Sequence, residues 1–254
     1  MNWEALNFSI LGPALAAGVL VLTTHVPLGK AVLKRGIIFI DLAIAQIAAV
    51  GVIAADAIGF EAGGWQVQFA AVSAAILGAL FLNWTEKKYE KIQEPIIGIS
   101  FVLSATLAIL LLANDPHGGE NLKDLLVGQI LWISFEQLIP IFLLYIVVIF
   151  IWFKFDIANQ SRLSFYLIFA VTITASVQLV GIYLVFASLI IPALATRLFS
   201  IKKQLFAAYI MGFLGYLFGL IASALFDLPS GALIVWSLAI LGVFVSMLNQ
   251  KHLS

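Results

Sequence analysis

The sequence predicts an all-α integral membrane protein, a polytopic helix bundle with about eight or nine transmembrane helices. Of its 254 residues, 63% are hydrophobic and only 10% are charged, whereas soluble domains contain about 45–50% apolar and about 25% charged residues. The mean hydropathy is +1.12. A water-soluble core could not enclose this many apolar side chains, so lipid must cover much of the chain.

Nine apolar stretches approach the length of about 20 residues that a helix needs to cross a hydrocarbon core about 30 Å thick. The sixth and seventh form one continuous apolar block that is only just long enough for two helices. Eight spans plus a re-entrant piece is therefore the alternative to nine crossings. The nine stretches are residues 8–27, 36–59, 65–84, 96–114, 136–153, 163–179, 181–199, 204–226 and 230–249.

The positions of the basic residues favour nine crossings with the N-terminus outside and the C-terminus in the cytoplasm. With that arrangement, every lysine and arginine except Lys123 falls in a cytoplasmic segment, as the positive-inside rule requires. An error of one span would destroy this pattern. The residues placed inside are Lys30, Lys34, Arg35, Lys87, Lys88, Lys91, Lys154, Arg162, Arg197, Lys202, Lys203 and Lys251.

The composition also argues against several classes of function. No cysteine is present and the formal net charge is zero, so disulfides, thiolate metal sites and nucleic-acid binding have no support. The sequence lacks G-x-x-x-x-G-K-[ST], so ATP hydrolysis by this chain is not expected. His25, His117 and His252 lie far apart and match no catalytic pattern, which argues against an enzyme. No linker or targeting signal is evident, and residues 1–254 are interpreted as one membrane domain.

Four stretches, in order along the chain, carry a resemblance to a known family. They are "VPLGKAVLKRG" (26–36), "LKDLLVGQILWIS" (122–134), "VGIYLVFASLIIPALATRLFS" (180–200) and "FDLPSGALIVW" (226–236). Together they resemble the permeases of ABC importers for zinc, manganese and iron(II). Thr196 stands where that family usually has alanine.

The resemblance implies a function and a set of partners. A bacterial inner-membrane permease of this kind imports a divalent metal ion, zinc first and manganese or iron(II) next, and binds no permanent cofactor. Its implied partners are a separate ABC ATPase subunit, an extracytoplasmic metal-binding protein, a second permease copy forming a homodimer, and membrane lipid. The alternatives are a stand-alone secondary carrier or channel, and an ABC permease for a metal chelate or another small solute.

The segment "IIPALATRLFSIKKQ" (190–204) resembles the region that couples such permeases to their ATPase. The residues concerned are Ile191, Pro192, Ala193, Thr196 and Arg197. Proline removes a helical donor and small residues allow helices to approach closely. Without the resemblance, the same residues would be interpreted as a helix kink followed by ordinary basic anchors.

An acid and an amide interrupt the apolar stretch "FIDLAIAQIAAVG" (39–51). A carboxylate at membrane depth costs a few kcal/mol, so it suggests a function. The family's second helix usually carries Gly-Asp-x-x-x-His; alignment places Asp41 at the glycine, Leu42 at the aspartate and Gln46 at the histidine. The usual pair of metal ligands is therefore absent, and an acid stands one residue earlier.

Three interpretations of Asp41 and Gln46 remain open. Both could line the metal path, with Asp41 binding the ion; the ligands could come from the partner subunit or from other residues; or both could only join helices by hydrogen bonds. Asp56 lies about four turns further along and is either an outer step of the same path or a solvated helix end.

The outer loop contains further ligand types. Asp115, His117 and Glu120 could capture a metal, although "DPHGG" also predicts a simple turn. The following stretch, 122–134, has the pattern of a short amphipathic helix with Trp132 at headgroup depth. In the family this outer face receives the binding protein.

Overall fold

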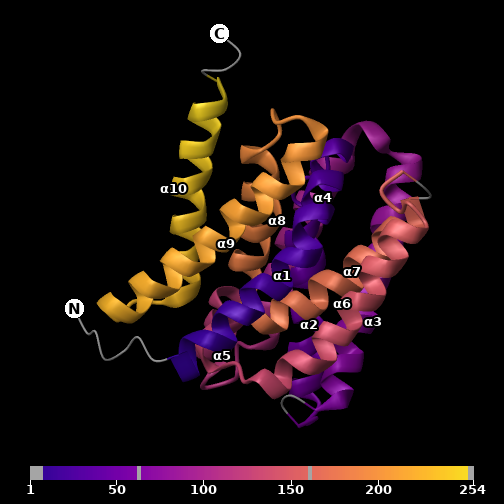
Figure 1. The fold of residues 1–254 in the computed structure, drawn as a ribbon. Helices are drawn as coiled ribbons and strands as arrows, with labels where there is room; N and C mark the ends of the chain where they lie inside the picture. Colours follow the sequence, from indigo (N-terminus) through magenta and orange to yellow (C-terminus); the bar gives the residue numbers. More distant parts are fainter. Residues whose placement is uncertain (1–7, 62–63, 160–161, 251–254) are drawn as a thin grey trace.

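The computed structural model describes residues 8–61, 64–159 and 162–250, and every regular element in these ranges is helical (Figure 1). This confirms the predicted all-α class. The α-helices are α1 (Phe8–Arg35), α2 (Ile40–Ala57), α3 (Trp65–Lys88), α4 (Gln93–Leu111), α5 (Gly118–Val127), α6 (Phe135–Lys154), α7 (Arg162–Val180), α8 (Ile182–Ala195), α9 (Ile201–Phe226) and α10 (Ser230–Gln250), with short 3₁₀ helices η2 (Glu90–Ile92) and η3 (Ile130–Trp132).

Eight helices in the described ranges are long and apolar enough to cross a membrane: α1, α2, α3, α4 (counted with η2), α6, α7, α9 and α10. The remaining apolar stretch, predicted as a span over 181–199, forms the 14-residue helix α8. At 1.5 Å per residue, α8 is about 21 Å long, which is shorter than a hydrocarbon core of about 30 Å. The predicted seventh stretch is therefore shorter than expected, and the prediction of about eight or nine transmembrane helices agrees with eight long helices plus the shorter α8.

A close contact between two glycines divides the long apolar block into α7 and α8. Gly181 has φ +80° and ψ 162°, and Gly128, just after α5, has φ +74° and ψ 167°; glycine is essentially the only residue that adopts this backbone region. A β-carbon on Gly181 would lie 2.6 Å from the Val127 carbonyl carbon. The chain can therefore reverse here only because neither residue has a side chain.

The first helix is longer than predicted. The expected span ended at residue 27, but α1 continues through Pro27 to Arg35. Proline cannot donate to the carbonyl four residues earlier, which belongs to Thr23. The Tyr209 hydroxyl of α9 donates to this carbonyl at 3.1 Å. A neighbouring helix thus satisfies the acceptor that proline leaves free, and α1 remains continuous.

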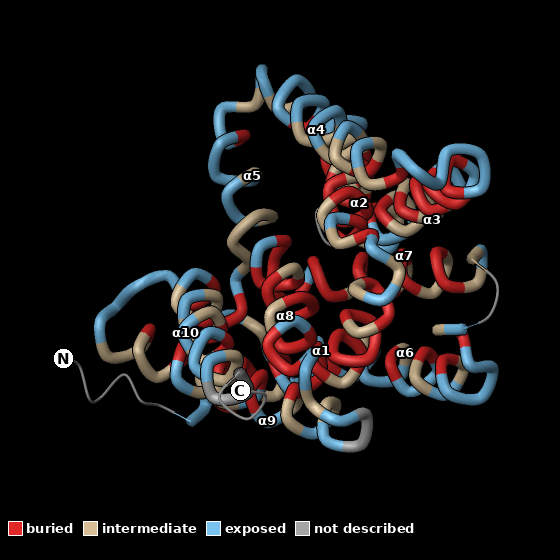
Figure 2. Tube along the Cα trace, turned by 90° about the horizontal axis from the view of Figure 1, so that it is seen from above, coloured by how far each residue is buried: buried red, intermediate tan, exposed pale blue. Residues whose placement is uncertain are grey.

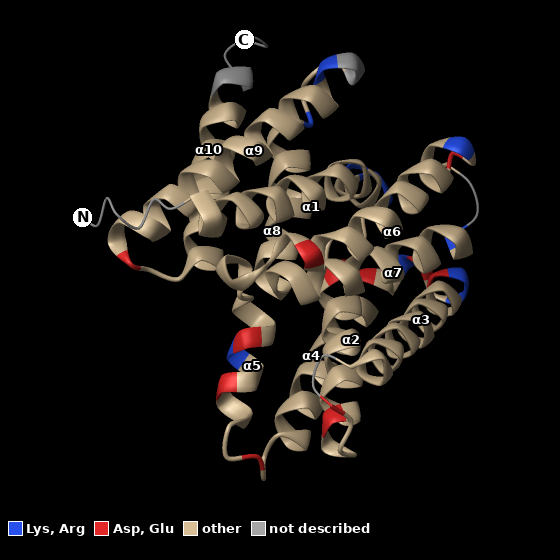
Figure 3. Ribbon diagram, turned by 60° about the horizontal axis from the view of Figure 1, so that its bottom comes forward, with Lys and Arg blue, Asp and Glu red and all other residues tan. Residues whose placement is uncertain are grey.

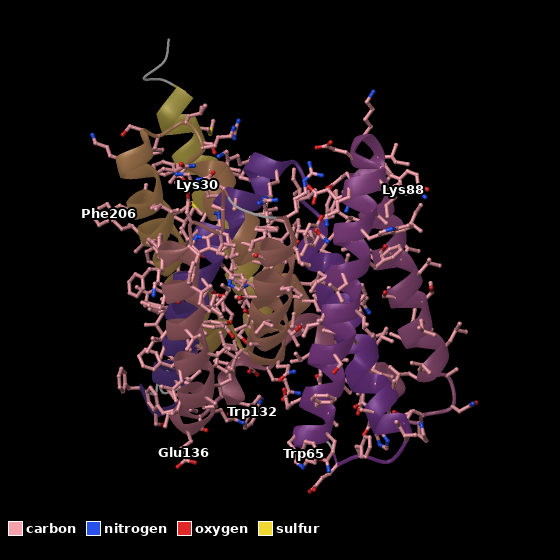
Figure 4. The ribbon with its side chains drawn as sticks, turned by 90° about the vertical axis from the view of Figure 1, so that its right-hand side faces the viewer. Lys30, Trp65, Lys88, Trp132, Glu136 and Phe206 are labelled. Atoms are coloured by element: carbon pink, nitrogen blue, oxygen red, sulfur yellow. The ribbon has the colours of Figure 1, made fainter. Side chains whose placement is uncertain are left out.

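Charged residues separate the two ends of the bundle. Lys30 and Lys88 lie at one end, while Trp65, Trp132 and Glu136 lie at the other (Figure 4). Figure 3 shows the basic residues gathered toward the first end, apart from one on α5, which carries Lys123. We call the first end the basic end. The predicted Lys251 lies outside the described residues, and the side chain of Lys202 is not described.

Burial distinguishes central from peripheral helices. In α2 and α7, 61% of the most apolar window is buried, against 11% in α4. Seen from above, buried residues concentrate where α1, α2, α7 and α8 meet, and α4 and α10 lie toward the outside (Figure 2). A polar side chain on α2 is therefore enclosed by protein where it faces this centre.

We predict that Gly181→Ala strongly reduces the amount of folded protein in the membrane. Alanine would have to adopt a conformation that costs about 1–3 kcal/mol while meeting the Val127 carbonyl carbon. The matched control is Gly98→Ala within α4, where a β-carbon meets nothing within 4 Å. Detergent-solubilised yield and unfolding temperature would measure both variants; equal values for the two would contradict this account of the turn.

Candidate functional site

The depth of Asp41 follows from the packing of α2 against α3. A β-carbon on Gly51 would meet Ala74 at 2.9 Å, and one on Gly78 would meet Ile47 at 2.7 Å, so the two helices run antiparallel. Extending this register places Asp41 at about the level of Trp84. That level is four residues, or about 6 Å, before α3 ends at Lys88. Asp41 therefore lies inside the bundle, below its basic end.

Asp41 and Gln46 are both buried, with 1% of each residue exposed. Neither carboxylate oxygen of Asp41 has a hydrogen-bond partner among the described residues, and neither does Oε1 of Gln46. The backbone amides of Leu42 and Asp41, in the first turn of α2, are the described groups that favour the charged form of this carboxylate. Buried polar atoms are normally hydrogen-bonded, so these three oxygens are available to a ligand.

The three predicted path residues do not meet at one point. Five residues separate Asp41 from Gln46, which is about 140° of rotation and about 7.5 Å of rise on an α-helix. Asp56 is exposed near the other end of α2. In the described part of the chain, no group of three or more His, Asp or Glu side chains could hold a metal ion. The arrangement is a sequence of separate polar positions along α2.

The predicted coupling residues differ in accessibility. Pro192, Ala193 and Thr196 are buried, and Thr196 Oγ1 donates to the Pro192 carbonyl at 2.7 Å, closing the end of α8. Arg197 is exposed, and its guanidinium donates to the Leu194 carbonyl at 3.1 Å. Ile191 is half-buried. The buried residues of this set therefore shape the end of α8, and Arg197 presents its charge at the surface.

The exposed surface here includes residues that sequence reasoning missed. Leu194 is 43% exposed and Leu198 is 44% exposed, on either side of Arg197. Lys30, Lys34, Leu194, Arg197 and Gln204 line an open hollow of about 390 Å³ at the basic end. Leu194 lies near the end of α8 and Leu198 in the turn that follows it. The position of two leucines on either side of Arg197 is the sequence signal that could have indicated this apolar and basic surface.

The remaining sequence candidates have local roles. The Asp115 carboxylate accepts from the backbone amide of His117 at 2.9 Å and from the Asn121 side chain at 3.0 Å, which matches the turn interpretation of "DPHGG". His25 of α1 is fully buried. Its Nδ1 lies 3.0 Å from the Val21 carbonyl, and its Nε2 has no described partner.

A polar network that sequence reasoning missed joins α3, α4 and α7 at the basic end. Gln93 donates to the Leu82 carbonyl at 2.9 Å and to the Tyr166 hydroxyl at 3.2 Å. Arg162 pairs with Glu90 at 2.8 Å and with Glu86 at 3.7 Å. These residues lie at the ends of the predicted spans. Charged side chains are common there, so the sequence alone did not indicate that these residues contact one another.

Comparison with known proteins identifies the family. The sequence matches the ABC 3 transport family over residues 7–160 and 157–249. The chain belongs to this family. It is 27% identical to the manganese transport system membrane protein MntC of Halalkalibacterium halodurans, over 91% of this chain and 85% of that protein. It is 26% identical to the high-affinity zinc uptake system membrane protein ZnuB of Haemophilus influenzae, over 97% of this chain and 100% of that protein.

Solved structures agree with the fold. A chain of PsaBC from Streptococcus pneumoniae, solved in complex with a Fab, has a TM-score of 0.76 and 20% sequence identity, covering 94% of this chain and 91% of that chain. An inward-facing structure described as a putative metal-chelate type ABC transporter has a TM-score of 0.68 and 16% identity, over 94% and 85% of the two chains. The helical arrangement is therefore shared with these two chains.

We predict that Asp41→Asn raises the unfolding temperature of the permease in detergent. The variant keeps the shape of the side chain but removes the charge of a buried carboxylate whose oxygens lack partners, and burying an unpaired charge costs more than burying a neutral amide. Asp56→Asn, on the exposed end of the same helix, should leave the unfolding temperature unchanged. A lower unfolding temperature for Asp41→Asn would mean that the carboxylate stabilises the fold.

Proposed function

We propose that this chain is the membrane-spanning permease subunit of an ATP-driven importer for divalent transition-metal ions. The observation that carries the proposal is the match to manganese and zinc transport proteins along nearly the whole chain, within a family of ABC transport proteins. Zinc, manganese and iron(II) are the candidate cargoes. The chain itself hydrolyses no ATP, because a separate ABC ATPase subunit supplies that activity.

The proposed metal path follows α2 from the outer end to the basic end. Asp56 provides an outer step, Gln46 an intermediate oxygen, and Asp41 the metal-binding carboxylate. The burial of Asp41 and its lack of partners support this assignment. A transient site of this kind needs few ligands, because tight coordination would prevent release of the ion.

The proposed coupling surface lies around the end of α8 and comprises Ile191, Pro192, Ala193, Thr196 and Arg197. Exposed Leu194 and Arg197 would contact the ATPase, while Pro192 and Thr196 fix the shape of the helix end. An apolar side chain beside a cation is a suitable contact for a partner protein, because Leu supplies apolar area and Arg supplies charged donors.

The proposed orientation in the bacterial inner membrane has the basic end in the cytoplasm, the N-terminus outside and the C-terminus inside. The gathering of lysine and arginine at one end supports it (Figure 3). The opposite end, with α5 and exposed Trp132, would receive an extracytoplasmic metal-binding protein. Residues 1–254 would form one permease domain that pairs with a second copy in contact with membrane lipid.

Cysteine labelling tests the orientation directly, since the chain has no native cysteine. We expect Glu136→Cys to react with a membrane-impermeant maleimide added to intact spheroplasts, and Lys88→Cys to react only after the membrane is opened. These two residues lie at opposite ends of the bundle (Figure 4). The reverse pattern would place the basic end outside and would overturn the proposed orientation.

Metal content tests the function. A deletion strain grown in chelated medium should lose one divalent metal and recover it when the wild-type gene is supplied. Asp41→Ala should fail to restore that metal although the protein is present in the membrane, and Gln46→Ala should restore it in part. Mass spectrometry of washed cells would measure all metals together. An unchanged metal profile in the deletion strain would mean another cargo, and uptake that persists without ATP would mean a secondary carrier or channel.

A further inference from the structure

A second carboxylate lies at the start of α2. Glu94, in the first turn of α4, reaches the chain that enters α2, where its Oε1 accepts from the backbone amide of Phe39 at 3.1 Å. Its other oxygen, Oε2, is buried and has no described partner. One oxygen of Glu94 therefore caps α2, and the second is free.

The carboxylate oxygens of Glu94 and Asp41 that lack partners lie in the same region, at the N-terminal end of α2. Glu94 accepts from the backbone amide of Phe39, two residues before Asp41 in the chain, and Asp41 lies in the first turn of α2. Asp41 is 1% exposed, and neither of its oxygens has a described partner. Three carboxylate oxygens from two helices, each buried and without a hydrogen-bond partner among the described residues, thus lie around the start of α2.

The two carboxylates at the start of α2 have no basic partner among the described residues. The N-terminus of a helix contributes the equivalent of about half a positive charge, against two carboxylates. The basic groups at this end of the bundle make other contacts: Lys34 donates to Asn159, and Arg162 pairs with Glu86 and Glu90. Arg35 donates to the Ala158 carbonyl and stacks on Phe165, and its buried Nε has no hydrogen-bond partner among the described residues. Among the described residues, no ion pair involves Asp41 or Glu94, so a cation from outside the chain would balance them.

We propose that Asp41 and Glu94 together bind the transported divalent cation, with Glu94 of α4 as its second carboxylate ligand. This inference rests on the proposed function and adds a ligand from a second helix. Within the described residues no histidine joins the pair, and the sequence contains no cysteine. Oxygen ligands suit Mn²⁺, whereas protein zinc sites usually include imidazole or thiolate. The pair therefore favours manganese as the cargo.

The competing explanation is that Glu94 only caps α2. Glu94→Gln separates the two roles, because the amide oxygen can still accept from the Phe39 amide while the charge that attracts a cation is lost. Glu90→Gln is the matched control: Glu90 lies at the same end but is exposed and pairs with Arg162.

The experiment uses the purified permease–ATPase complex without nucleotide and titrates it with Mn²⁺, followed by electron paramagnetic resonance. We expect Glu94→Gln to weaken binding by about tenfold or more, since even the loss of a group that only orients a metal ligand costs about 10–100-fold. Glu90→Gln should bind as the wild type does. Asp41→Asn should weaken binding similarly, and the double variant should add little, because both changes remove one shared ion.

Each other result has a defined meaning. Wild-type Mn²⁺ affinity in Glu94→Gln, with normal uptake by vesicles, would overturn the inference and leave Glu94 as a helix cap. If Glu94→Gln does not fold, Asp41→Asn still tests whether this site binds Mn²⁺, and unchanged affinity would again overturn the inference. If the wild-type complex moves no divalent metal into vesicles, the proposed function itself fails, which is distinct from loss of this site alone.

Discussion

The backbone contact between Gly128 and Gly181 is the constraint on which the arrangement of this bundle depends. It turns an apolar block that could have formed one long helix into α7 and α8. Because α8 then runs back toward the basic end, it finishes beside Lys30 and Lys34, where Arg197 is exposed. The same contact holds the loop after α5 against the interior. One glycine pair thereby determines where the proposed coupling surface lies and how the opposite face is anchored.

A short series of contacts links that surface to the proposed metal site. The ring of Phe186 on α8 stacks on the ring of Phe39, with centroids 6.1 Å apart and planes 8° from parallel. The backbone amide of Phe39 is also the donor to Glu94. A movement of α8 would therefore act on the residue that Glu94 caps. This gives the proposed importer a physical route between the ATPase contact and the ion.

Much of the fold could be predicted because lipid imposes simple rules. Apolar length identified the helices, and the one-sided basic residues identified a common end. The differences have local causes. The first apolar stretch was expected to end at residue 27, but α1 continues because Tyr209 satisfies the Thr23 carbonyl that Pro27 leaves free. Helix α8 is short because of a backbone turn that hydropathy does not report. The burial of Asp41 was predictable from the cost of a carboxylate in lipid. Glu94 was missed because it lies in "KIQEPIIG" (91–98), where a charge beside a proline is typical of a loop.

The two-carboxylate site also accounts for release. A divalent cation between Asp41 and Glu94 would cancel their charges, so the ion and the two helices would hold one another in place. Glu94 reaches the site from α4 and Asp41 from α2, and a small separation of these helices would leave the ion with one carboxylate. Coulomb attraction falls with distance and with the entry of water, so such a separation would weaken binding steeply. A site shared by two helices can thus bind the ion in one state and release it in another, which a pair of ligands on α2 alone could not do without unfolding the helix.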